Sequence, residues 1–133
     1  MGVWLVEEFL PKFENATILE LGAGPGLCGM ISAHTAKTVV LTDYQDLVMD
    51  LIDQNMSKCN PRPGACSLFS AQLDWDKMSD PSFFDSLEYT NSDQLVEGKF
   101  SSITFDYVIG SDVVYWPQSI DPLVNVLNTL FER

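Results

Sequence analysis

Basic residues are scarce in this sequence of 133 residues, where 7 lysines and arginines stand against 19 aspartates and glutamates. The resulting net charge of -12 repels phosphate backbones and anionic membrane surfaces. We therefore expect no nucleic-acid partner and no membrane partner, whereas a cationic ligand or a basic protein surface would be attracted. The same charge could also serve only to keep the protein soluble.

Residues that bind metals or form disulfides are also few. The three cysteines, Cys28, Cys59 and Cys66, form no C-x-x-C pair, and none stands beside the only histidine, His34. This pattern predicts no metal site and no disulfide framework, and it favours a reducing compartment, so we expect the protein in the cytoplasm or the nucleus. No apolar stretch approaches the roughly 18 residues that a bilayer-spanning helix needs.

Apolar residues make up 46% of the chain, which is enough for one hydrophobic core, and we interpret residues 1–133 as a single domain. Segments typical of strands lie at 17–21, 37–43, 65–75 and 105–110, and segments with helical spacing lie at 3–13, 27–36, 45–58 and 119–132. Residues 77–101 are polar and acidic, which indicates a loop on the surface of the protein with at most a weak helix near 81–87. The alternation predicts an α/β fold: a Rossmann-like, doubly wound parallel sheet of about four strands, with helices on both faces.

A cluster of four glycines follows the first predicted strand, and it fits two ligand-binding patterns. A G-x-G-x-x-G pattern from Gly24 is typical of dinucleotide-binding turns, whereas an earlier G-x-G begins at Gly22, directly after the strand. Pro25 removes one of the backbone N–H groups that hold a pyrophosphate, and the Glu20 carboxylate would repel that anion. Because the same carboxylate would attract an ammonium or a sulfonium, the earlier pattern is favoured.

An acidic residue, Asp43, ends the second predicted strand. An aspartate at this place can accept hydrogen bonds from both ribose hydroxyls of an adenine-containing cofactor. Proteins that bind different adenine-containing cofactors share this feature, so it does not identify the cofactor. Asp43 could instead cap the helix that begins near Gln45.

These motifs together resemble the seven-strand, S-adenosylmethionine-dependent methyltransferases, and more closely their subfamily of methyltransferase-like protein lysine methyltransferases. The segment ELGAGPG with LTD downstream is similar to the first two motifs of that group. Three further motifs of that group have matches here in the order in which the group has them. They are GVW with Trp4, LDW with Asp74 and Trp75, and GSDVVY at 110–115. The resemblance runs from Gly2 to the end of the chain, and it implies the strand order 3-2-1-4.

The resemblance also implies a cofactor, S-adenosylmethionine, and a set of residues that bind it. The methionine part would contact Gly22, Ala23, Gly24 and Glu20, the ribose Asp43, and the adenine Asp74 and Trp75, with Trp4 and Ser111 completing the pocket. For Trp4 and Trp75, core packing is the alternative role.

The D-x-x-Y motif of the subfamily implies the catalytic residues. Asp112 would orient the acceptor amine or receive its proton through water, and Tyr115 would form a wall of the channel for the target lysine. Their alternative roles are to cap the turn after the strand and to pack. We expect a protein N-methyltransferase that acts on lysine of a protein substrate, and the charge favours a basic one. We expect no metal ion.

The chain departs from the family in length, because it stops after the helix that follows the fourth predicted strand. We therefore expect an incomplete domain in which FDYVIG forms an exposed parallel edge strand. Three other functions remain open: a non-catalytic cofactor-binding or adaptor fragment of the same fold, a small-molecule methyltransferase, and an NAD-dependent oxidoreductase that uses the later glycine pattern.

Overall fold

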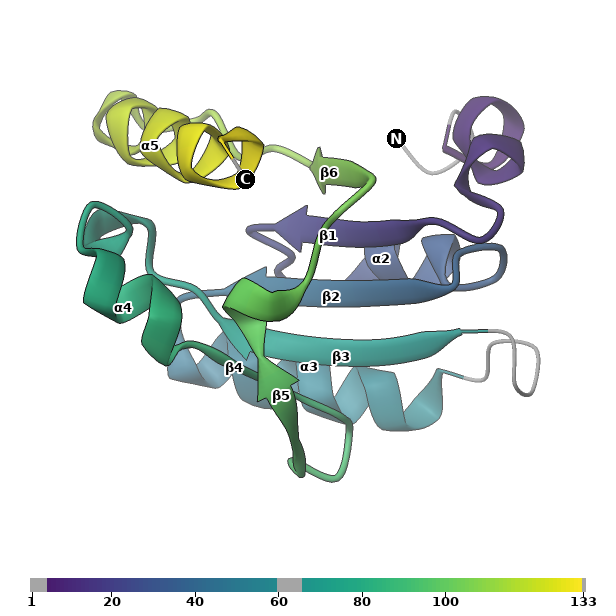
Figure 1. Ribbon diagram of the computed structural model, residues 1–133. Coiled ribbons are helices and arrows are strands. Elements are labelled where there is room, and N and C mark those ends of the chain that lie inside the picture. Colours follow the sequence, from purple (N-terminus) through teal and green to yellow (C-terminus); the bar gives the residue numbers. More distant parts are fainter. Residues whose placement is uncertain (1–4, 60–65, 133) are drawn as a thin grey trace.

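A six-stranded sheet in the order β5-β4-β3-β2-β1-β6 forms the centre of the computed structural model, which describes residues 5–59 and 66–132 (Figure 1). The strands are β1 (Thr17–Leu21), β2 (Thr38–Asp43), β3 (Ser67–Gln72), β4 (Glu88–Thr90), β5 (Val96–Lys99) and β6 (Tyr107–Gly110). The α-helices are α2 (Leu27–Ser32), α3 (Asp46–Lys58), α4 (Pro81–Ser86) and α5 (Ile120–Phe131). Shorter helical turns are η1 (Leu5–Phe9), η2 (Leu10–Phe13), η3 (Trp75–Lys77), η4 (Phe100–Ser102) and η5 (Pro117–Ser119).

Four parallel strands make the core of the sheet, and their order β3-β2-β1-β6 confirms the predicted order 3-2-1-4. Glu20 of β1 pairs with Leu41 on one side and with Ile109 on the other. This register aligns the carboxyl ends of the strands, so that the loops after β1, β2 and β6 emerge at one edge of the sheet. Ligands of doubly wound sheets bind at that edge.

The prediction for residues 77–101 was wrong about strands, because β4 and β5 extend the sheet there as an antiparallel pair. Their sequences, EYT and VEGK, are short and carry few β-branched residues, so local propensity does not mark them as strands. Packing of Tyr89 against Phe69 of β3, with ring centroids 4.9 Å apart, helps to hold β4 on the sheet. The weak helix was predicted correctly and is α4, which Asp80 caps by accepting a hydrogen bond from the Ser82 amide over 2.9 Å.

Two other predicted helices are shorter or less regular than expected. The entry helix at 3–13 consists, from Leu5 onward, of the turns η1 and η2, since Pro11 lacks the N–H that a continuing α-helix needs. The helix predicted at 27–36 ends at Ser32, whose hydroxyl donates to the Cys28 carbonyl over 2.8 Å.

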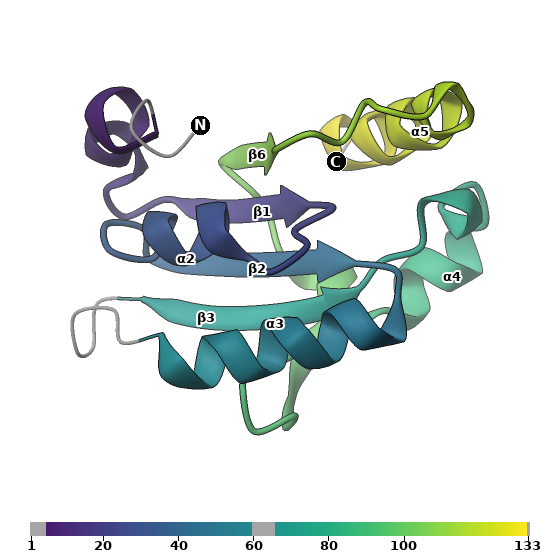
Figure 2. The same ribbon diagram turned by 180° about the vertical axis from the view of Figure 1, so that it is seen from behind.

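Helices cover both faces of the sheet, as predicted. Side chains alternate along β1, so Ile18 packs with α2 and α3 on one face while Leu19 packs with α4 and α5 on the other (Figures 1 and 2). Ile52 and Met56 are the buried residues of the amphipathic helix α3. The two cores fix the sheet between its helices and thereby fix the loops at its carboxyl edge.

The strand β6 lies at the end of the sheet in the described part of the chain, where it pairs with β1 alone. The expectation of an edge strand here is met, and the Tyr107 side chain is 37% exposed. None of the helices in the described ranges combines the length and the apolar character that crossing a membrane requires.

Candidate cofactor site and active site

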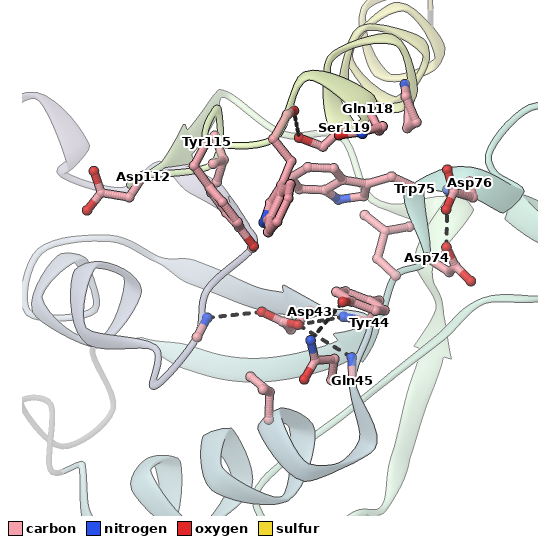
Figure 3. Close-up of a pocket in the computed structure, with 17 residues that line it drawn as sticks. Asp43, Tyr44, Gln45, Asp74, Trp75, Asp76, Asp112, Tyr115, Gln118 and Ser119 are labelled. Atoms are coloured by element: carbon pink, nitrogen blue, oxygen red, sulfur yellow. Dashed lines mark hydrogen bonds between the residues drawn. The ribbon is translucent and has the colours of Figure 1, made fainter.

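A cavity of about 590 Å³ opens at the carboxyl edge of the sheet (Figure 3). Its volume lies within the roughly 300–1,000 Å³ that small-molecule sites occupy. Its walls come from the loops after β1, β2, β3 and β6 and from the start of α5. The lining residues are Gly22, Gly24, Asp43, Tyr44, Gln45, Val48, Leu73, Asp74, Trp75, Asp76, Asp112, Val113, Tyr115, Trp116, Gln118, Ser119 and Pro122.

Most of the residues predicted from the sequence meet in this cavity. The lining includes Gly22, Gly24, Asp43, Asp74, Trp75, Asp112 and Tyr115. Three predicted residues are absent from it, namely Glu20, Ala23 and Ser111, and Trp4 lies outside the described residues. Ala23 is buried and donates its amide hydrogen to the Thr42 carbonyl over 2.8 Å, and Ser111 forms a side-chain hydrogen bond with Cys28.

The glycine loop leaves backbone open to the cavity at Gly24. Gly24 has φ +53°, in the left-handed region that side chains disfavour, and a Cβ built on it would meet no protein atom within 4 Å. A Cβ on Gly26 would instead lie 2.9 Å from Leu41 Cδ1, inside the packing of α2 on the sheet. Both glycines of the earlier pattern, Gly22 and Gly24, line the cavity, whereas Gly26 and Gly29, which occur in the later pattern alone, do not.

The Asp43 carboxylate joins the loops after β1 and β2. It accepts hydrogen bonds from the backbone amides of Gly24 at 3.1 Å, Tyr44 at 2.8 Å and Gln45 at 3.4 Å (Figure 3). A carboxylate has about four acceptor sites, so one site and the long, weak bond to Gln45 remain for a hydroxyl group of a ligand. Asp43 thus stabilises the turn before α3, which is the alternative role considered from the sequence. It can still accept a hydrogen bond from a ligand.

Trp75 stands on the turn η3 and supplies an aromatic wall. Its ring lies beside the glycine loop, since a Cβ on Gly22 would be 3.5 Å from Trp75 Cζ2. Asp74 holds this turn by accepting a hydrogen bond from the Asp76 amide over 3.1 Å, and its other oxygen pairs with Lys77 at 3.1 Å. Asp74 therefore positions Trp75, and Trp75 offers the flat apolar surface.

Glu20 lies away from the cavity lining, on the face of β1 that α2 covers. Its side chain is 2% exposed, and Oε2 accepts a hydrogen bond from the Gly29 amide over 2.8 Å. Burial raises the pKa of Glu20 to about 7, and the hydrogen bond from Gly29 opposes that rise. The arrangement fastens α2 to β1 and offers no direct contact with a ligand, unlike the arrangement expected from the sequence.

The turn after β6 carries the D-V-V-Y segment. Asp112 adopts φ +57°, a left-handed conformation that aspartate tolerates better than most residues. In Figure 3 the Tyr115 ring reaches from this turn toward the glycine loop, while the Asp112 carboxylate points away from Trp75 and Asp43. The Tyr115 side chain is 72% exposed, so its ring is free to form one side of a binding surface.

Several lining residues escaped the sequence analysis. Tyr44 and Gln45 follow Asp43 directly, and Trp116 follows the D-V-V-Y segment directly. Their signal was their place just beyond a strand end, where side chains of a doubly wound sheet face the ligand. The contribution of Gln118 and Pro122 depends on how α5 returns over the sheet, for which the sequence contains no local signal.

The charge of the lining has one sign. Asp43, Asp74, Asp76 and Asp112 line the cavity, and no lysine or arginine does so among the residues that the structure describes. Such a lining disfavours a pyrophosphate and suits a ligand with an ammonium or a sulfonium group. Residues 5–59 and 66–132 contain no cluster of three or more metal-binding side chains placed to hold an ion.

A glycine loop, an acidic residue after the second strand and an acidic, aromatic cavity come together at the carboxyl edge of the α/β sheet, and this combination is typical of Rossmann-like domains. Comparison with known protein families identifies the family within this fold class. The model of the lysine methyltransferase family matches residues 4–133, and the chain belongs to that family.

Curated relatives agree with this family. The chain is similar to protein N-lysine methyltransferase METTL21A of Xenopus tropicalis, with 29% identity over 111 residues that cover 84% of this chain and 42% of that protein. It is also similar to the protein-lysine N-methyltransferase EEF2KMT of Homo sapiens, with 26% identity over 98% of this chain and 37% of that protein. For the calmodulin-lysine N-methyltransferase of Arabidopsis thaliana the identity is 25%, over 91% of this chain and 34% of that protein. The chain spans less than half the length of each of these relatives.

Proposed function

We propose that this chain forms the cofactor-binding part of an S-adenosylmethionine-dependent protein N-methyltransferase that acts on lysine. The observation that carries the proposal is the meeting, in one acidic cavity, of the open backbone at Gly24, the Asp43 carboxylate and the Tyr115 ring. The relatives named as lysine methyltransferases support the reaction class.

The described residues fit the proposed cofactor. A methionine moiety would lie along the glycine loop, where the absence of a Cβ at Gly24 leaves space, and a ribose hydroxyl would donate to Asp43. The adenine would lie against Trp75. The aspartates of the lining would offset the positive charges of the sulfonium and the ammonium, which a nicotinamide dinucleotide with its pyrophosphate lacks.

When bound, S-adenosylmethionine supplies an electrophilic methyl group: its carbon–sulfur bond breaks as the amine lone pair forms the new nitrogen–carbon bond, a thioether leaves, and the amine gives up a proton. The chain has to present the lysine without that proton. A lysine with a pKa of about 10.4 costs roughly 4 to 5 kcal/mol to hold neutral at pH 7. Tyr115 would form one wall of the channel for the lysine side chain. Asp112 would receive the proton of the amine through water, because its carboxylate lies at the outer side of the turn.

The substrate in this proposal is a protein with basic character. A net charge of -12 and an acidic cavity would attract lysine-rich surfaces and raise the rate of encounter. We place the protein in the cytoplasm or the nucleus, a proposal supported by three free thiols, since Cys28, Cys59 and Cys66 all lie in the described ranges and form no disulfide.

Methyl transfer can be measured directly. The purified chain is incubated with S-adenosylmethionine labelled in its methyl group and with a mixture of histones as basic protein probes, and the products are hydrolysed and analysed for Nε-methyl-lysine. We expect label in methyl-lysine, and a rate at least about 100-fold lower for Asp112→Asn, which tolerates the left-handed backbone. Tyr115→Ala, which removes the ring, should also lower the rate, whereas Tyr115→Phe keeps the wall.

Two results of this assay would contradict the proposal. One is label in arginine or in small molecules with none in lysine. The other is a rate for Asp112→Asn and Tyr115→Ala equal to that of the unmodified chain.

A further inference from the structure

Two large aromatic side chains stand side by side at the mouth of the cavity. Tyr115 is 72% exposed and Trp116 is 60% exposed, and both line the cavity. Their ring centroids are 6.2 Å apart and the ring planes meet at 63°, an edge-to-face arrangement. Rings of this size usually bury most of their area, so exposure of two neighbours indicates a surface kept for a ligand.

The backbone of Trp116 is held in place by the residues that follow it. The residue that follows, Pro117, restricts Trp116 to an extended conformation, and Trp116 has φ -111° and ψ 127°. Its carbonyl accepts hydrogen bonds from the Ser119 amide over 3.0 Å and from the Ser119 hydroxyl over 2.8 Å. The indole is therefore carried on a fixed support, and little chain entropy is lost when a ligand binds to it.

The charge around the two rings favours a cation. Asp112 lies three residues before Tyr115 on the same turn, and the lining contains no lysine or arginine in the described ranges. The face of an aromatic ring attracts an ammonium group, and indole does so most strongly. A pair of rings in a cavity lined by aspartates suits an ammonium that carries methyl groups, because methyl groups contact the rings while the positive charge remains.

We propose that Trp116 forms, with Tyr115, an aromatic wall that binds the ammonium head and the methylene stem of the acceptor lysine. This inference rests on the proposed function and adds to it a specificity-determining residue outside the D-x-x-Y motif. A cation on the wall is held more firmly than a neutral amine, so the wall aids capture of the substrate and retention of its methylated forms. It does not aid removal of the proton, which falls to other groups.

The wall can be tested on the purified chain without a known substrate. Choline serves as the methylated ammonium probe, and 3,3-dimethylbutan-1-ol serves as its neutral isostere of nearly the same shape. Binding is followed through the indole N–H resonance of Trp116 in ¹H–¹⁵N spectra, assigned by its loss in Trp116→Phe. The matched pair of variants is Trp116→Phe, which keeps a ring, and Trp116→Leu, which keeps apolar bulk alone. Because the variants lack that resonance, their affinities are read from the ¹⁵N amide resonances of Tyr115 and Ser119.

We expect choline to bind about tenfold more tightly than its isostere. Trp116→Leu should lose about tenfold in choline affinity, Trp116→Phe less than about threefold, and both should keep the affinity for S-adenosylhomocysteine and the thermal unfolding midpoint. Equal affinity for choline and its isostere would overturn the inference. So would a loss of S-adenosylhomocysteine binding in Trp116→Leu with choline binding intact, since Trp116 would then belong to the cofactor site.

The outcome separates this inference from the proposed function. Ring-dependent choline binding without any methyl-lysine formation would refute the enzymatic proposal and retain the ammonium site. Methyl-lysine formation at an unchanged KM in Trp116→Leu, with no preference for choline, would refute the wall and retain the enzyme.

Discussion

The Gly24 amide donates a hydrogen bond of 3.1 Å to the Asp43 carboxylate, and this bond ties the glycine loop after β1 to the end of β2. The two residues are 19 positions apart in the chain and meet at the carboxyl edge of the sheet. One carboxylate thus shapes the loop and faces the cavity at the same time. Substitution of either residue should therefore lower the affinity for a ligand more than it lowers the stability of the fold.

Replacement of Asp43 by asparagine should weaken the binding of S-adenosylhomocysteine. The amide oxygen can still accept from Gly24, but the charge-assisted hydrogen bond to a ribose hydroxyl is lost, which corresponds to roughly 10-fold to 100-fold in affinity. Isothermal titration calorimetry measures the change. Asp50→Asn on the exposed side of α3 is the matched control, and equal affinities of the two variants would show that Asp43 serves only the turn.

Replacement of Gly24 by alanine should abolish ligand binding at a small cost in stability. The new methyl group meets no protein atom within 4 Å and would occupy the space of the ligand, while φ +53° costs about 1–2 kcal/mol in unfolding free energy. Asn15→Ala is the control, because Asn15 has φ +61° and lies outside the cavity lining. S-adenosylhomocysteine binding in a thermal-shift titration should vanish in Gly24→Ala alone. Retained binding would return this loop to a purely structural role.

Replacement of Gly29 by alanine should destabilise the fold. The added Cβ would overlap with Leu41 Cδ2 and would lie 2.6 Å from Glu20 Oε2, so these buried side chains or α2 itself have to shift. We expect a loss of about 1–3 kcal/mol in the free energy of unfolding, measured by urea denaturation. Leu27→Ala in the same helix removes a side chain that is 60% exposed and should cost much less. Equal losses in the two variants would contradict the close packing of α2.

The buried carboxyl group of Glu20 should make stability depend on pH. Its pKa rises from an ordinary 4.5 to about 7 on folding, so the folded chain holds the proton more tightly than the unfolded chain. The corresponding stabilisation, about 3 kcal/mol, is complete below pH 4.5 and is lost as the pH rises through about 7.

Glu20→Gln removes this titration and keeps an acceptor for the Gly29 amide. The variant should therefore gain stability relative to the unmodified chain between pH 5 and pH 8, as measured by urea midpoints at both values. Glu14→Gln, at an exposed glutamate, is the control. Parallel profiles of Glu20→Gln and the unmodified chain would exclude an ionisable role for Glu20 in this range.

Local patterns were sufficient to predict the parallel core of the fold. The run TILEL, the glycine loop and the run TVVLTD have preferences that act within a few residues, and they lead to β1, α2 and β2. The pair β4 and β5 escaped prediction because short edge strands are held by packing against a sheet that already exists, as Tyr89 is on Phe69.

The sequence also predicted that Asp43, Trp75 and Tyr115 would lie near one another, because each stands at or just after the end of a strand and all parallel strands end at one edge. The structure places the three in one cavity, and their roles stay predictions. Trp116 was missed because tryptophan is highly buried on average, which favours a packing role, and its 60% exposure is a result of the surrounding packing.

The sequence by itself determined the chemical character of the molecule and its local turns. Its excess of acidic residues, the glycines that turn after β1 and the proline after Trp116 act through charge and backbone sterics, which need no distant partner. Tertiary structure alone decided which side chains share a space. Glu20 and Asp43 are both acids near the ends of neighbouring strands, yet one is buried under α2 and the other faces the cavity. Glu20 pairs with Leu41, so Asp43 lies on the same face of the sheet but two residues nearer its carboxyl edge, beyond the part that α2 covers. How far a helix covers a strand depends on packing between segments that are distant in the sequence.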